Sequence, residues 1–238
     1  MVAPQPSARL HGYPVSNWFN CARAVMIEKG LGDDYIACRA SGDADFLAKS
    51  AMGKIPWLET PQGGIAETIA IIEYLEGEFP ALPIMPEANF EKAKVRQIVN
   101  IVQLYIEAPM RDLYPATFMG PEHDASVVTR SLAVVARAFI ALDQLCDFGP
   151  FLRGNRLTSA DLALFYTLEL GERAARHLAA TSFFENRPML QQWDAAIRSR
   201  ESTKLVLADF APAFADYCAQ RNATWDEAQY QEERFSHA

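Results

Sequence analysis

The chain has 238 residues, of which 50% are hydrophobic and 22% are charged, an ordinary composition for a soluble globular protein of one or two domains. Its formal net charge of −8 disfavours non-specific binding to nucleic acid or to an anionic membrane. No apolar run approaches the roughly 20 residues of a membrane-spanning helix. Residues 1–9 also lack the basic-then-apolar pattern of a signal peptide. These features predict a cytoplasmic protein that binds neither nucleic acid nor membrane.

The cysteines and histidines are scattered along the chain. No two cysteines have the C-x-x-C spacing of a zinc or redox motif, and their number and separation do not indicate a disulfide framework. The histidines are equally isolated, so we expect no metal site. The residues concerned are Cys21, Cys38, Cys146, Cys218, His11, His123, His177 and His237.

The first part of the chain alternates between strand and helix patterns. Residues 9–13 form a candidate strand. Apolar positions three and four residues apart then predict a helix over 17–29, closed by Gly30. A second strand is expected at 35–38 and a short helix at 43–49. A strand, a helix and a strand in this order need a crossover connection, so the first two strands should be parallel.

Two further strands and a helix complete this mixed part. The strand predicted over 53–59 contains Pro56, which belongs at an edge or a strand end because proline has no N–H to donate. The double glycine at 63–64 makes a turn, after which 65–66 can pair antiparallel with the preceding strand. A helix follows at 67–79. Together the elements predict a thioredoxin-like sheet.

Only helical patterns follow the mixed part. Residues 80–89 hold three prolines, and we place an interdomain linker at 81–89. The linker divides the chain into an N-terminal domain of residues 1–80 and an all-helical domain of residues 90–238.

The helices of the second domain have recognisable apolar faces. They are predicted, in chain order, at 90–109, 128–146, 157–173 and 188–200. Pro109 should kink or end the first of them, because proline removes a helix hydrogen bond. The tail from Asp209 onward is more polar, and its pattern leaves its order open.

Three consecutive motifs carry a resemblance to a known family. Residues 53–58 read G-K-I-P-W-L, residues 64–68 read G-I-A-E-T and residues 70–75 read A-I-I-E-Y-L. In this order they resemble the cytosolic glutathione S-transferase family, in which a G-K-[VI]-P-x-L strand precedes an acid–hydroxyl pair and a helix reading A-I-x-x-Y-L. The chain looks like a serine-type, bacterial-like member. The resemblance implies a cis peptide bond between Ile55 and Pro56.

A second matching segment lies in the helical part. Residues 157–163, L-T-S-A-D-L-A, are similar to the S/T-x-A-D segment that opens a helix in that family. Thr158 can cap the helix, and Asp161 can return a hydrogen bond to the cap. The resemblance covers residues 9–80 well and 89–205 in outline. It implies a thioredoxin-like α/β N-terminal domain followed by an all-α helical bundle.

The family activates the thiol of glutathione with a hydroxyl or thiol just after the first strand. The resemblance gives this role to Ser16, seven residues before Arg23 at the mouth of the first helix. Its Oγ would donate a hydrogen bond to the glutathione thiolate. The alternative is that Ser16 serves only as a helix cap. Tyr13 and Cys21 are rival candidates, and Asn17 could assist.

The resemblance also implies how glutathione is held. The Glu67 carboxylate would bind its ammonium group, and the Thr68 hydroxyl with the helix N-terminus would bind the γ-glutamyl carboxylate. Alternatively, Glu67 only complements the helix dipole. The backbone of Ile55, beside Pro56, would bind the cysteinyl unit. Lys54 would contact a glutathione carboxylate or would simply be a solvated surface lysine.

A second-substrate site is expected between the two domains. Aromatic and apolar side chains after Ser16 and around the Pro109 kink could line an apolar pocket, although each could equally be ordinary core. The candidates are Tyr13, Trp18, Tyr105, Met110 and Tyr114, with Phe19 and Phe118 beside them.

The resemblance implies a glutathione transferase-type enzyme that directs the glutathione thiolate at a small, apolar electrophile. Glutathione-dependent isomerase, dehalogenase or peroxidase chemistry fits the same residues. A non-catalytic binding or regulatory protein of the same fold is the alternative from another class. The resemblance further implies a homodimer.

Overall fold

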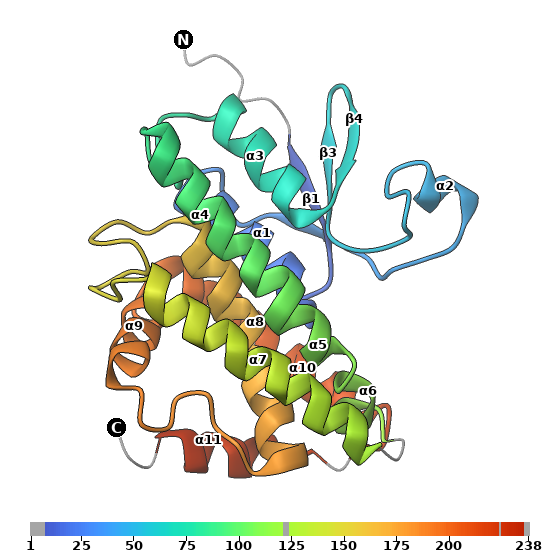
Figure 1. The fold of residues 1–238 in the computed structure, drawn as a ribbon. Helices are drawn as coiled ribbons and strands as arrows, with labels where there is room; N and C mark the ends of the chain where they lie inside the picture. The colour runs from blue at the N-terminus through green and yellow to red at the C-terminus, as the bar shows by residue number, and fades with distance from the viewer. Residues whose placement is uncertain (1–7, 121–123, 224, 236–238) are drawn as a thin grey trace.

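The structure is a computed structural model that describes residues 8–120, 124–223 and 225–235. Residues 1–7, the greater part of the segment 1–9 on which the absence of a signal pattern was predicted, lie outside the described residues, as do His123 and His237. Figure 1 shows a small sheet with its helices at one end of the molecule and a larger group of helices at the other. The predicted fold class, a mixed α/β part followed by a helical part, is confirmed.

Four short strands form one mixed sheet in the order β2-β1-β3-β4. They are β1 (Arg9–Gly12), β2 (Tyr35–Ala37), β3 (Trp57–Thr60) and β4 (Gly63–Ala66). β1 runs parallel to β2 and antiparallel to β3, and Leu10 lies opposite both Tyr35 and Leu58. β3 and β4 are antiparallel. Both predicted directions are therefore correct. Pro56 comes just before β3, where its missing N–H does not break the ladder.

Three helices belong to this part of the chain. They are α1 (Asn17–Glu28), α2 (Ala44–Leu47) and α3 (Thr68–Glu78). α1 packs closely on the sheet because Gly12, at the end of β1, has no side chain. A Cβ there would lie 2.2 Å from the ring of Phe19. Phe19 is fully buried and meets the ring of Tyr35 edge-on.

The second part is built from helices around α8. The elements are α4 (Asn89–Ile101), η1 (Val102–Glu107), α5 (Ala108–Arg111), α6 (Tyr114–Phe118), α7 (Ala125–Leu145), α8 (Ser159–Ala179), α9 (Pro188–Arg198), α10 (Glu201–Ala219) and α11 (Glu227–Phe235). α8 is buried along nearly its whole length, and in Figure 1 it lies behind α4 and α7, which run side by side. It is the central helix of the helical core.

The helix expected over 90–109 continues past Pro109 after a change of hydrogen bonding. The segment η1 is a π-helix, and at its end the N–H of Ala108 bonds to the carbonyl of Gln103, five residues back. Pro109 cannot donate to the turn before it, and π-helical turns are a known way to absorb such a missing bond. The wider turn lets the chain continue into α5 without a break.

The tail that gave no clear pattern is helical. Asp209 lies inside α10, which passes through Pro212, and α11 follows it. The inward side of α10 is apolar, with Val206, Phe210 and Phe214 buried. Because polar residues lie on the outer side, the average composition of the tail did not reveal this apolar face.

Helix α1 is shared by the two parts of the molecule, because it packs against α3 and β1 on one side and α8 and α10 on the other. Arg23 in α1 pairs with Asp33 at 2.5 Å and with Asp209 of α10 at 2.8 Å. At the C-terminal end of α1, the Glu28 carboxylate accepts two hydrogen bonds from Arg200, at 2.7 and 2.5 Å. These contacts fix the middle and the C-terminal end of α1 against the helical part.

Residues 81–88 of the proposed linker 81–89 lie in turns and bends between α3 and α4, and its last residue, Asn89, begins α4. The linker is held at several points. Glu76 accepts hydrogen bonds from the backbone N–H groups of Ile84 and Met85, each at 3.2 Å. The buried ammonium of Lys29 bonds to Glu76 at 2.7 Å and to the carbonyl of Leu82 at 3.1 Å. The linker is thus anchored to α1 and α3.

The capping box predicted at the start of α8 is present. Asp161 Oδ2 accepts the backbone N–H of Thr158 at 2.8 Å. Its other oxygen accepts the backbone N–H of Leu152 at 2.7 Å and the indole N–H of Trp193 at 2.9 Å. Asp161 therefore ties the loop before α8 and helix α9 to one buried point.

Helix α7 is the single described helix long and apolar enough, by length and composition, to cross a membrane. Core helices of soluble proteins pass the same test. α7 packs against α4, η1, α5 and α8, with Val135, Phe139 and Leu142 buried in the helical core. This packing buries the inward apolar face of α7.

Candidate functional site

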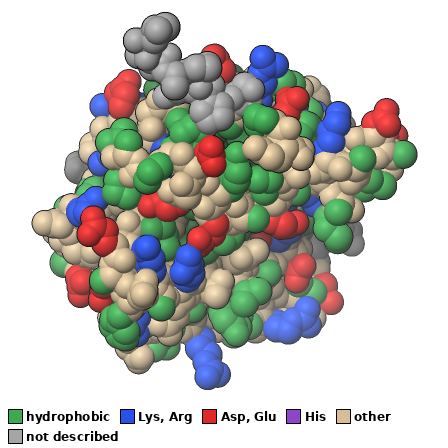
Figure 2. Space-filling model, turned by 90° about the horizontal axis from the view of Figure 1, so that it is seen from above, with side chains coloured by type: hydrophobic (Ala, Val, Ile, Leu, Met, Phe, Trp, Pro, Cys, Tyr) green, Lys and Arg blue, Asp and Glu red, His purple; other side chains and the backbone are tan. Residues whose placement is uncertain are grey.

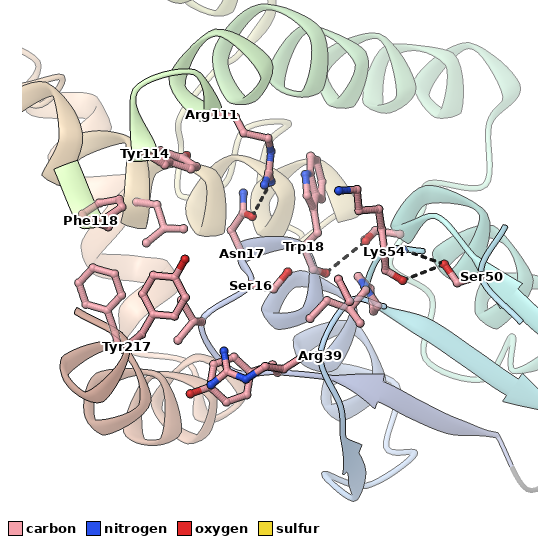
Figure 3. A pocket seen from close by; sticks show the side chains of 18 of the residues that line it. Ser16, Asn17, Trp18, Arg39, Ser50, Lys54, Arg111, Tyr114, Phe118 and Tyr217 are labelled. Atoms are coloured by element: carbon pink, nitrogen blue, oxygen red, sulfur yellow. Dashed lines mark hydrogen bonds between the residues drawn. The ribbon is translucent and has the colours of Figure 1, made fainter. Parts of the chain in front are cut away.

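A cavity of about 630 Å³ lies between the sheet part and the helical part. Residues from β1–α1, the loop before β3, the start of α3, and helices η1, α5, α6, α8 and α10 line it. Figure 3 shows Ser16 near its centre, with Lys54 and Ser50 to one side and Tyr114, Phe118 and Tyr217 to the other. Most sequence-predicted site residues meet here: Tyr13, Ser16, Trp18, Lys54, Ile55, Pro56, Glu67, Thr68 and Tyr114.

Ser16 is the N-cap of α1 and also lines the cavity. Its Oγ accepts the backbone N–H of Phe19 at 3.3 Å, and its own N–H bonds to the carbonyl of Tyr13 at 2.9 Å. A serine hydroxyl can accept and donate at the same time, so the cap bond leaves the Ser16 proton free for a ligand. The helix N-terminus adds a partial positive charge at the same point.

The two rivals of Ser16 differ in their surroundings. Cys21 is fully buried, and this burial raises the pKa of its thiol to about 12, so it is not a thiolate near neutral pH. Tyr13 does line the cavity, but the guanidinium carbon of Arg39 lies 3.9 Å from the centre of its ring. Tyr13 thus supports a cation at the cavity wall.

The loop before β3 is held in shape by Ser50 and Gly53. The Ser50 hydroxyl donates to the carbonyl of Lys54 at 2.8 Å and accepts the N–H of Lys54 at 3.2 Å. Gly53 has a positive φ of 65°, and a Cβ there would lie 2.5 Å from the carbonyl oxygen of Ser41. The Ile55–Pro56 peptide bond is cis, as the resemblance implied.

Ile55 lies just before the strand ladder, which begins at Trp57. The sheet therefore does not use its backbone groups, and Ile55 lines the cavity. Lys54 is exposed and lines the same side of the cavity.

The start of α3 combines an acid, a hydroxyl and free backbone donors. Glu67 is exposed and has a positive φ of 69°, a conformation that a non-glycine residue adopts only when its surroundings impose it. Thr68 is buried, and its hydroxyl donates to the carbonyl of Trp18 at 3.2 Å. The Thr68 hydroxyl proton is therefore engaged in this bond and is not available to a ligand. The first-turn N–H groups of α3 are the remaining donors for an anion.

The opposite wall of the cavity is aromatic. Tyr114 and Phe118 come from α6, and Phe214 and Tyr217 come from α10. Tyr114 is 6% exposed, and its hydroxyl has no hydrogen-bond partner among the described residues. Burial raises the pKa of Tyr114, so its hydroxyl keeps its proton and can donate it. The sequence pattern had not pointed to the two residues from α10.

Two residues expected to line the second-substrate site lie elsewhere. Tyr105 lies in η1 but is 52% exposed and is not part of the cavity wall. Met110 is fully buried and packs toward Gly171 of α8, where a Cβ would lie 3.6 Å from its side chain. Gln103 and Arg111 line the cavity instead. Proximity to Pro109 in sequence did not tell which side of the helix faces the cavity.

A polar network next to Ser16 was not predicted. Glu107, buried in η1, accepts the side-chain N–H of Asn17 at 3.3 Å and a short hydrogen bond from Arg111. Arg111 also donates to the side-chain oxygen of Asn17 at 3.2 Å. Figure 3 shows this last bond spanning the gap between α1 and α5. The network fixes the first turn of α1 against the helical part.

Within the described ranges, no group of three histidine, cysteine, aspartate or glutamate side chains could hold a metal ion. The cavity instead offers hydroxyls, cations, one carboxylate and backbone N–H groups, which suit an organic ligand with charged ends and a reactive centre.

Comparisons with known proteins agree with this arrangement. The family model described as "Glutathione S-transferase, N-terminal domain" matches residues 10–83. A glutathione S-transferase of Pseudomonas putida is 31% identical over 211 residues, covering 87% of this chain and 96% of the relative. A maleylacetoacetate isomerase of Dictyostelium discoideum is 33% identical over 126 residues, covering 50% of this chain and 56% of the relative. The crystal structure of a glutathione S-transferase from Rhodospirillum rubrum is 26% identical with a TM-score of 0.71, covering 88% and 99% of the two chains.

Proposed function

Because this chain belongs to the glutathione S-transferase family, we propose that it binds glutathione in the cavity and directs the thiolate at an electrophile held against the aromatic wall. The observation that carries the proposal is the position of Ser16. It caps α1 near the centre of the cavity, between Lys54 on one side and Tyr114 with Phe118 on the other, and Glu67 at the start of α3 lines the same cavity.

Ser16 is the proposed catalytic residue. Its Oγ–H donates to the sulfur, and the N-terminus of α1 adds favourable potential, so that the thiol loses its proton to solvent more readily. The cap bond from Phe19 orients the hydroxyl without consuming its proton. The protein thus stabilises the nucleophile before the reaction.

The remaining charged ends of glutathione match this side of the cavity. Glu67 receives the ammonium, and the first-turn N–H groups of α3 receive the γ-glutamyl carboxylate. Ile55 pairs through its backbone with the cysteinyl unit, beside Pro56, and Lys54 binds the glycyl carboxylate. Thr68 shapes the site through its bond to the Trp18 carbonyl.

The second substrate sits on the aromatic side, near Tyr114, with Tyr13 also lining the cavity, whereas Trp18 lies on the Lys54 side of Ser16 in Figure 3. The thiolate attacks its electrophilic carbon by displacement or addition. A second candidate is glutathione-dependent isomerisation, favoured by the likeness to the maleylacetoacetate isomerase of Dictyostelium discoideum. In that case the thiolate adds to a double bond, the bond rotates and the thiolate leaves again. Consumption of glutathione separates the two, because only conjugation uses it up.

The test is a glutathione titration of the wild type and Ser16→Ala, followed by calorimetry and by thiolate absorbance against pH. We expect both proteins to bind glutathione. The wild type should lower the thiol pKa by at least ~1 unit, whereas Ser16→Ala should not. Ser16→Thr is the matched control, because it keeps the hydroxyl. Equal thiolate formation in the wild type and Ser16→Ala would contradict the role of Ser16, and no binding to the wild type would contradict the function.

We propose further that the enzyme is a cytoplasmic homodimer. Apolar side chains are exposed on α4, η1 and α7, where Phe90, Leu104 and Ile140 are each more than half exposed, at 68%, 56% and 58%. Such side chains favour contact with a second copy. Light scattering after gel filtration should give twice the 26.5 kDa of one chain, and a mass of one chain would contradict the dimer.

A further inference from the structure

The residues that line the cavity carry a net positive charge, whereas the whole chain is net negative. The chain carries a net charge of −8. Figure 2 shows acidic, basic and hydrophobic side chains intermixed on the face seen from above. Around the cavity, the described lining residues include three cations, Arg39, Lys54 and Arg111, and a single carboxylate, Glu67. This excess of positive charge favours the binding of ligands that carry anionic groups.

Glutathione, on the proposed function, uses only part of this charge. Its ammonium binds the Glu67 carboxylate, its γ-glutamyl carboxylate binds the N–H groups at the start of α3, and its glycyl carboxylate binds Lys54. Arg111 is neutralised by the buried carboxylate of Glu107. Arg39 is the cation left over. It has no carboxylate within 4 Å in the part of the chain that the structure describes.

The position of Arg39 places this spare charge on the second-substrate side. Its guanidinium lies over the ring of Tyr13, whose carbonyl accepts the N–H of Ser16 at 2.9 Å. In Figure 3 the guanidinium lies on the side of Ser16 that faces Tyr217, away from Lys54. Stacking on an aromatic face leaves the N–H groups at the edge of a guanidinium free to bind an oxyanion.

A second, independent observation points to the same kind of ligand. The hydroxyl of Tyr114 is buried in the cavity wall without a hydrogen-bond partner among the described residues. A buried hydroxyl without a partner is costly, and a bound acceptor oxygen would satisfy it. Among the described residues, the cavity therefore offers an unpaired cation, Arg39, beside Tyr13 and an unpaired hydroxyl donor, Tyr114, in the aromatic wall.

We propose that the second substrate is an acid, an unsaturated or aromatic electrophile that carries a carboxylate, and that Arg39 selects it by binding that carboxylate. This inference rests on the proposed function and narrows its substrate class. The apolar electrophile expected from the sequence becomes one with an apolar body and an anionic end. Arg39 determines specificity, while Ser16 still acts on the sulfur.

Two matched electrophiles test the proposal. 1-Chloro-2,4-dinitrobenzene is neutral, and 4-chloro-3,5-dinitrobenzoate carries a carboxylate. With both, the thiolate sulfur bonds to the ring carbon, chloride leaves with the bonding electrons, and the thiol proton passes to solvent. We expect the wild type to favour the benzoate in kcat/KM relative to the uncatalysed rates. Arg39→Gln should lower this preference roughly 10-fold or more, mainly through KM, because it removes a charge-assisted hydrogen bond.

Controls separate this inference from the proposed function. Arg39→Lys should retain part of the preference, because it keeps the charge. Lys54→Gln should raise KM for glutathione and weaken both reactions together, leaving the preference in place. If the wild type turns over the neutral substrate but does not favour the benzoate, or if Arg39→Gln keeps the preference, the inference is overturned and the transferase function stands. If the wild type does not bind glutathione, the proposed function itself fails.

Discussion

Ser16 and Phe19 are joined across the first turn of α1 by a hydrogen bond from the backbone N–H of Phe19 to Ser16 Oγ, at 3.3 Å. The same oxygen therefore supports the helix and faces the cavity. Loss of this side chain should have a structural and a chemical effect. Ser16→Ala should reduce the free energy of unfolding by about 1 kcal/mol, the usual cost of losing a helix cap. Urea unfolding followed by tryptophan fluorescence measures it, and an unchanged midpoint would show that the cap bond contributes nothing to stability.

Tyr114→Phe should separate stability from activity. It removes a buried hydroxyl that has no partner among the described residues, so we expect stability to be unchanged or to rise by up to about 1 kcal/mol. It also removes the donor proposed for the acidic substrate, so kcat/KM for the benzoate should fall. Thermal unfolding and steady-state kinetics on one preparation report both. A clear loss of stability would mean that the hydroxyl is satisfied in the folded protein.

The contact between Glu28 and Arg200 should make stability pH-dependent. Burial alone would raise the pKa of Glu28, but the hydrogen bonds from Arg200 and Ser202 outweigh it and lower the pKa below the ordinary 4.5. A carboxylate with a lowered folded-state pKa stabilises the protein above its unfolded-state pKa, and this contribution is lost as the pH falls through the folded value.

Glu28→Gln should therefore cost about 1–3 kcal/mol at neutral pH, as expected for hydrogen bonds to a charged group. The difference from the wild type should shrink steadily as the pH drops below 4.5. Denaturant midpoints measured for both proteins across that range give the result. A difference that is independent of pH would assign the effect to packing and not to the ion pair.

Gly53 should be required for the loop that carries Lys54 and Ile55. Gly53→Ala places a Cβ 2.5 Å from the Ser41 carbonyl oxygen at a positive φ, so the loop must shift. We expect a rise in KM for glutathione and a stability loss of about 1–3 kcal/mol. Gly42→Ala is the control in the same region, since a Cβ there meets nothing within 4 Å. Equal behaviour of the two variants would contradict this requirement.

Tyr217 and Tyr105 form a pair that tests the placement of the second-substrate wall. Tyr217 lines the cavity from α10, whereas Tyr105 is exposed on η1 outside it. Tyr217→Ala should raise KM for the electrophile several-fold, as a loss of aromatic contact does, with little change in KM for glutathione. Tyr105→Ala should change neither. Steady-state kinetics with each substrate varied in turn distinguishes them, and the reverse pattern would restore the placement expected from sequence.

The features that sequence predicts well are those set by local chemistry. Pro56 ahead of a strand, the acid–hydroxyl pair at Glu67 and Thr68, and the capping box of Thr158 and Asp161 all depend on residues close in the chain. The fold class follows because these local signals occur in a fixed order. The side of the cavity proposed to bind glutathione could therefore be outlined from sequence.

The proposed second-substrate side of the cavity could not be outlined from sequence, because its lining depends on which face of each helix turns inward. Arg39 carries no motif, and Arg111 is placed by its bonds to Glu107 and Asn17, 94 positions away from Asn17 in the chain. The π-helical turn before Pro109 also changes the side-chain register in a way that apolar periodicity does not reveal. Tyr217 lies in the tail after Asp209, which is polar when averaged over its whole length. Contacts between segments far apart in the chain determine these side-chain positions. Such contacts cannot be recognised in a single sequence.

The cavity is assembled from two stretches of gene that lie far apart. The residues proposed to activate the sulfur and hold glutathione lie no later than the start of α3, whereas Phe214 and Tyr217 lie in the last long helix. Nucleotide changes in that late stretch can alter what the enzyme accepts while the thiolate chemistry stays intact. On the proposed function, substitutions in α10 can therefore change substrate choice without rebuilding the reactive centre.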